Sequence, residues 1–103
     1  MDRNSQRLLL TLEQERRNIN RETINPVIQE LDIDGLRPIV TMVAEVRAAY
    51  IKSLMDLAQK RDGLPSAEEI KSLTLLRKSF NELVDAANAM ETAIERGYLD
   101  VSS

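Results

Sequence analysis

The side chains that most enzymes use for nucleophilic or acid–base chemistry are scarce in this chain of 103 residues, which contains no Cys and no His. Thiol nucleophiles, Ser–His pairs and Cys/His zinc sites are therefore excluded. Carboxylates are plentiful, but those between residues 68 and 95 recur where a helix would face solvent, which is typical of a solvated surface. With 3 Gly, the chain also lacks a glycine-rich phosphate loop. We therefore expect a protein that is not an enzyme and that needs neither a metal nor a cofactor.

The nearest approach to a metal-binding motif is Asp32-x-Asp34-Gly35, which partly matches a calcium loop. Such a loop needs an acid six residues after the glycine, and that position is Thr41. A helix cap explains the pattern better, and we expect Asp34 to be the N-cap of the following helix.

Basic side chains are concentrated in the first quarter of the chain, which holds five arginines against four acids. Phosphate binding favours a strongly positive surface, and single-strand binding also favours aromatic side chains. The whole chain has a net charge of −3, a pI near 5.0 and 3% aromatic residues. Ion pairing on a solvated surface is thus the simpler interpretation. The alternative function is a nucleic-acid-associated regulator that contacts phosphates through Arg16, Arg17 and Arg21.

Apolar residues recur at spacings of three and four, which predicts an all-α fold. The strongest pattern predicts a helix over about 66–96, opened by the capping box Ser66–Glu69 and closed by Gly97. A second helix is expected over about 35–61, with Pro38 in its first turn. A weaker one is expected over about 5–24, before Asn25-Pro26.

Residues 62–65 alone connect the two long helices, and so short a connection predicts an antiparallel hairpin. Facing residues of such a pair have numbers with a nearly constant sum. Leu54 with Leu73 gives 127, and Val46 with Phe80 gives 126. We expect one helical domain over 1–103, built as a three-helix bundle or as a dimeric helical bundle with coiled-coil contacts.

A second apolar row lies beside the core stripe of the 35–61 helix, and it makes that helix more apolar than one partner helix can cover. Two kinds of helix could cover this row: the N-terminal helix of the same chain, or a helix of a second copy or of another protein. The function predicted from this row is protein–protein interaction, as an adaptor or regulatory subunit and as a homo-oligomer, for example a homodimer. The predicted interface residues are Ala44, Ala48, Ile51, Met55 and Ala58, followed by Leu8, Leu9 and Leu12 as an arm that a dimer could exchange.

The apolar run Leu8–Leu10 is the longest near the start of the chain, far short of the ~20 residues that span a bilayer. It is also too short for a signal peptide. We expect a cytoplasmic protein that does not enter a membrane.

Overall fold

The computed structural model describes residues 2–60 and 62–102, and they form three helices: α1 (Arg3–Ile24), α2 (Ile33–Lys60) and α3 (Ala67–Glu95). The predicted all-α class is confirmed. The chain divides into two compact units. The hairpin unit is Leu36–Asn88, and the terminal unit combines Met1–Gly35 with Ala89–Ser103.

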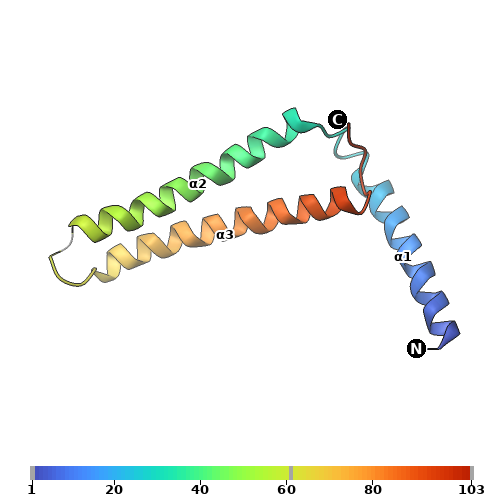
Figure 1. The fold of residues 1–103 in the computed structure, drawn as a ribbon, viewed down its shortest axis with the longest axis horizontal. Helices are drawn as coiled ribbons and strands as arrows, with labels where there is room; N and C mark the ends of the chain where they lie inside the picture. The colour runs from blue at the N-terminus through green and yellow to red at the C-terminus, as the bar shows by residue number, and fades with distance from the viewer. Residues whose placement is uncertain (1, 61, 103) are drawn as a thin grey trace. The chain divides into compact units, whose positions relative to one another are not determined.

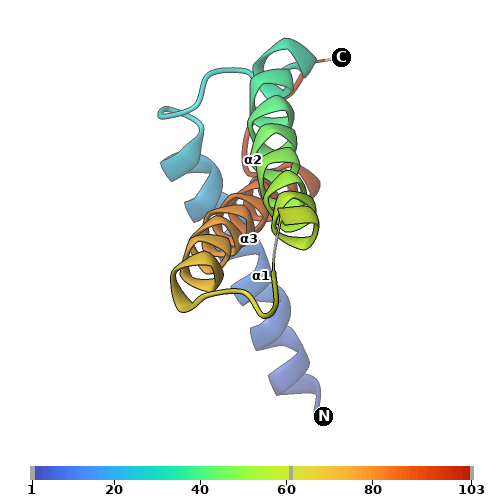
Figure 2. The ribbon, with the colours of Figure 1, turned by 90° about the vertical axis from the view of Figure 1, so that its left-hand side faces the viewer.

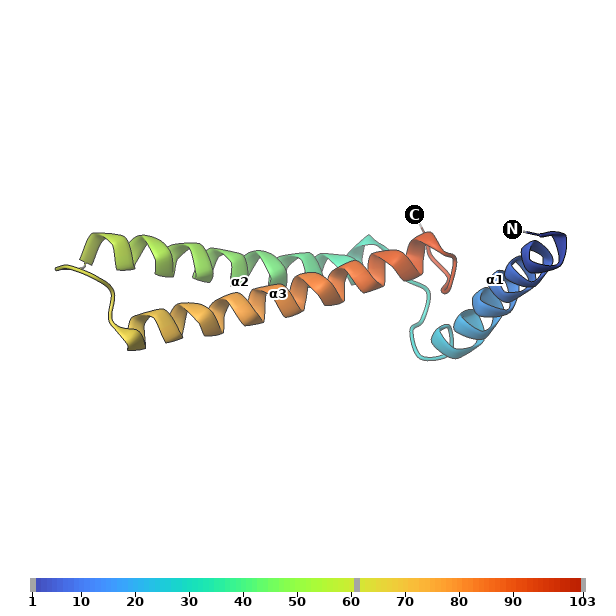
Figure 3. The ribbon, with the colours of Figure 1, turned by 90° about the horizontal axis from the view of Figure 1, so that it is seen from below.

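In the hairpin unit, α2 and α3 lie side by side and run antiparallel (Figures 1 and 3). Figure 2 shows the two helices from the end at which they are connected. The Tyr50 and Phe80 ring centroids lie 6.2 Å apart, and the Arg47 guanidinium lies 5.2 Å from the Phe80 centroid. This confirms the predicted hairpin. The half-buried residues that line its contact are Leu36, Ile39, Val43, Val46, Tyr50, Ser53 and Leu57 on α2, and Glu69, Leu73, Leu76, Phe80, Leu83 and Ala87 on α3.

Near the connection, this contact line differs from the predicted stripe. Leu54 is 55% exposed and Ile70 is 46% exposed, whereas Ser53 and Glu69 are half-buried. A strict alternation of three and four residues leads from Tyr50 to Ser53, while hydrophobicity alone favours Leu54. The geometric period decides which residue faces the other helix, so polar side chains occupy this end of the contact.

The helix starts are set by side-chain caps. The predicted capping box is confirmed: the Glu69 amide donates to Ser66 Oγ (3.1 Å), and the Ser66 amide donates to the Glu69 carboxylate (2.9 Å). The N-cap predicted for α2 was wrong, because the Gly35 amide donates to the carboxylate of Asp32 (2.9 Å). Since α2 starts at Ile33, Pro38 lies beyond the first turn and removes one helical hydrogen bond.

In the terminal unit, the chain after α3 runs beside the segment between α1 and α2 (Figure 1). Gly97 ends α3 at φ +72°, where the Tyr98 amide donates to the Ala93 carbonyl and the Gly97 amide to the Ile94 carbonyl. These two bonds form a Schellman motif, as the glycine predicted. The tail continues as a parallel bridge between Leu31 and Val101.

The most buried side chains of the described residues belong to this tail. Tyr98 is 8% exposed and Leu99 is 4% exposed. The small core of the terminal unit is therefore formed by residues that follow α3.

Candidate interaction surface

The five residues predicted as an interface on α2, here called the α2 face, are all exposed. Ile51 is 50% exposed and Met55 is 55% exposed. Each residue of a helix turns by about 100°, and the row residues lie one or two positions past the contact line, so the row is centred about two fifths of a turn away from the contact with α3. The hairpin therefore brings the five side chains into one row and leaves that row uncovered by its own second helix. The α2 face consists of Ala44, Ala48, Ile51, Met55 and Ala58.

Three further apolar side chains widen this surface. Val40 continues the row toward the start of α2 and is 65% exposed. Leu54 and Ile70 each follow a contact-line residue, and in an antiparallel pair such positions on both helices lie on the same side. Leu54 was missed as a surface residue because the sequence pattern pairs it with Leu73 in the contact between the two helices. Strict counting of threes and fours along each helix places both Leu54 and Ile70 outside the contact line.

The second predicted interface, on α1, is exposed as well. Leu8 is 68% exposed, Leu9 48% and Leu12 47%. None of the residues of α1 is buried. This cluster belongs to the terminal unit, whereas the α2 face belongs to the hairpin unit, so each is a candidate surface of its own unit.

The three arginines predicted to contact phosphates have different surroundings. Arg16 forms an ion pair with Glu13 at 3.0 Å, and Arg17 is exposed. Arg21 donates to the Gly97 carbonyl (3.0 Å) and pairs with the carboxylate of Asp100. Arg21 thereby ties α1 to the tail, a role that sequence reasoning did not predict.

Asn25, the C-cap of α1, also binds Asp100. The Asn25 side-chain amide donates to the Asp100 carboxylate (3.2 Å), and the Asp100 amide donates to the Asn25 side-chain oxygen (3.1 Å). The hydrogen bond from Asn25, followed by the hydrogen bond and charge of Arg21, lowers the pKa of Asp100 below its usual 3.8.

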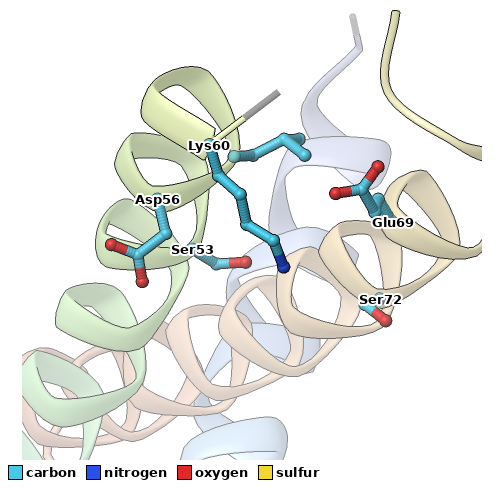
Figure 4. Close-up of a pocket in the computed structure, with 6 residues that line it drawn as sticks. Ser53, Asp56, Lys60, Glu69 and Ser72 are labelled. Atoms are coloured by element: carbon cyan, nitrogen blue, oxygen red, sulfur yellow. The ribbon is translucent and has the colours of Figure 1, made fainter. Parts of the chain in front are cut away.

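A polar cleft of about 180 Å³ opens between α2 and α3 near their connection (Figure 4). Its acids already have partners: Asp56 accepts from Lys52 at 2.9 Å, and Glu69 belongs to the capping box. Hydrogen bonds from Ser66 lower the pKa of Glu69; the bond from the Ser66 backbone has the larger effect, and the bond from its side chain comes next. These acids support the helices, and we assign no reaction to the cleft. Its lining residues are Ser53, Asp56, Leu57, Lys60, Glu69 and Ser72.

Metal-binding groups do not converge either: across residues 2–60 and 62–102, no three acidic side chains are grouped so that they could hold a metal ion. The exposed apolar side chains are thus the feature that calls for a functional explanation.

Comparison with known proteins gives no further indication, since no family model, curated protein or solved structure matches the chain significantly. Within the described part of the chain, none of the helices has the length and apolar character needed to cross a membrane.

Proposed function

We propose that this chain is a non-catalytic interaction protein, an adaptor or regulatory subunit, that binds a helix of its partner on the α2 face. The observation that carries the proposal is the exposure of Ile51 and Met55 in a continuous apolar row. Burying one large apolar side chain contributes about 1.5–3 kcal/mol, so covering this row provides a substantial driving force for association.

The composition of the row suits a helix as the binding partner. The three alanines of the α2 face allow a second helix backbone to approach closely, while Ile51 and Met55 supply contact area. Methionine has a flexible, polarizable side chain that adapts to different shapes. Charged residues flank the row, including Glu45 and Lys52, and such flanking charges set the register between helices.

The test compares which proteins are retained by the tagged chain and by its variant Ile51→Asp, with a copy of the chain itself counted as a partner. A charge at the centre of the row should abolish retention, because an unpaired buried carboxylate is costly. Ser79→Asp, at an exposed position of α3, adds the same charge away from the row and should retain the partner. Circular dichroism should show equal helix content in all three proteins. If Ile51→Asp retains the same proteins as the wild type, the α2 face is not the binding surface.

A further inference from the structure

We infer that the occupant of the α2 face is α2 of a second copy of this chain, packed antiparallel about a two-fold axis that passes between the levels of Ala48 and Ile51. The inference rests on the proposed function, because it names the partner of the same surface. It is carried by the order of small and large side chains in the row and by the more polar character of the neighbouring helix.

The side-chain sizes fit this arrangement. In an antiparallel pair in which facing residue numbers add up to 99, Ala48 lies opposite Ile51 of the second copy, and Ala44 lies opposite Met55 of the second copy. Ala58 then lies opposite Thr41. The two-fold axis repeats each contact, so every large side chain meets a small one. Such alternation of large and small residues fills the space between two helices evenly.

Two alternative arrangements lose this complementarity. Shifting the antiparallel register by seven residues toward the end of α2 places Ile51 against Met55, and Ala48 against Ala58. A parallel pair places every residue against its own copy, so Ala44 and Ala48 each meet an alanine. Both alternatives give layers of two large side chains next to layers of two small ones, which leaves crowding in some layers and gaps in others.

The charges beside the row are compatible with the same arrangement. Glu45 and Lys52 each follow a residue of the row, Ala44 and Ile51, and so lie along the same edge of the helix. Asp56 follows Met55 and lies on this edge too, so in the proposed register Glu45 lies within about two residues of the levels of both Lys52 and Asp56 of the second copy, one attractive and one repulsive neighbour. A parallel pair instead brings Lys52 near Arg47 of the second copy, which repels it. The Lys52 side chain is 75% exposed and pairs with Asp56 of its own helix.

The neighbouring surface of α3 is more polar than the α2 face, and we therefore place the second copy along α2. Of the six α3 residues that follow the contact line, and so share the side on which the α2 face lies, two are apolar, Ile70 and Val84, and four are polar: Thr74, Arg77, Asn81 and Asn88. The row from Ala44 to Ala58 rises about 21 Å along the helix. A contact of this size is at the small end of protein–protein interfaces, and we expect a dissociation constant in the micromolar range.

Because the chain contains no cysteine, pairs of engineered cysteines can test the register directly. The variants Ala44→Cys and Met55→Cys are mixed at about 100 µM under mild oxidation, above the expected micromolar dissociation constant. The mixture should form a disulfide between the two different variants, because the register places residues 44 and 55 opposite each other. Ala44→Cys alone should not cross-link, because its two copies lie about 16 Å apart along the axis, beyond disulfide range. Ala86→Cys, at an exposed position of α3, should not cross-link with Met55→Cys.

Each contrary result has a definite meaning. Efficient cross-linking of Ala44→Cys with itself would show a parallel pair, and a wild-type chain that is monomeric by light scattering at about 100 µM would overturn self-pairing. If that monomeric chain still retains a different protein and Ile51→Asp does not, self-pairing is wrong and the proposed function stands. If Ile51→Asp changes neither self-association nor retention, both are wrong.

Discussion

Replacing Leu99 by Ala should destabilise the terminal unit strongly, because Leu99 is the most buried side chain of the described residues at 4% exposed. Substitutions of this kind cost about 2–5 kcal/mol, the sum of lost transfer free energy and the cavity that remains. In a small core the neighbouring groups can partly close the cavity, so we expect about 3 kcal/mol. For a domain of this size, that loss lowers the melting temperature by more than about 10 °C.

Leu64→Ala is the matched control, because it removes the same atoms from a side chain that is 93% exposed. Its effect should stay within about 0.5 kcal/mol. Urea unfolding followed by circular dichroism gives the two free energies of unfolding. Amide hydrogen exchange at Leu31 and Ser102, whose amides donate to Asp100 and Leu31 carbonyls, reports on the terminal unit itself. Equal free energies for both variants, with unchanged exchange at these amides, would refute the assignment of Leu99 to a core.

Two further changes test the tail. Gly97→Ala should cost about 1–2 kcal/mol in urea unfolding, because the φ of +72° suits glycine and strains alanine; a loss below a few tenths would contradict the Schellman ending of α3. The pKa of Asp100 is lowered in the folded chain, so its contribution to stability is present above its ordinary pKa of 3.8 and is lost as the pH falls through the lower folded value. Asp100→Asn should therefore flatten the stability profile below about pH 4, measured against the wild type by urea unfolding, and an unchanged slope would exclude this contribution.

Local signals in the sequence predict most of the hairpin. The Ser66–Glu69 capping box and Gly97 fix the two ends of α3, and each acts within a few residues, so neither depends on the rest of the fold. The short connection at 62–65 then leaves α2 and α3 no arrangement except antiparallel. The half-buried contact line follows from this geometry.

Two kinds of feature could not be predicted from the sequence: the exact period of the contact line along each helix, and contacts between residues far apart in the chain. Leu54 is apolar but falls one position off the contact line, so its chemical character pointed to the core while the helix geometry placed it outside. Arg21 contacts Gly97, which lies 76 positions later in the chain, and Asp100, which lies 79 positions later. No local sequence pattern predicts contacts over such a separation. For the α2 face, the sequence predicted the apolar row and left its occupant open between the same chain and another.

The link between Leu31 and Val101 has a consequence for biosynthesis. The hairpin unit is continuous in sequence, so its two helices can pair as soon as α3 has left the ribosome. The terminal unit needs residues from both sides of the hairpin in the sequence. The bridge between Leu31 and Val101 can therefore form only after Val101 has been translated. During synthesis the hairpin unit can therefore form first, whereas the terminal unit gains its buried side chains, Tyr98 and Leu99, only after they have been translated.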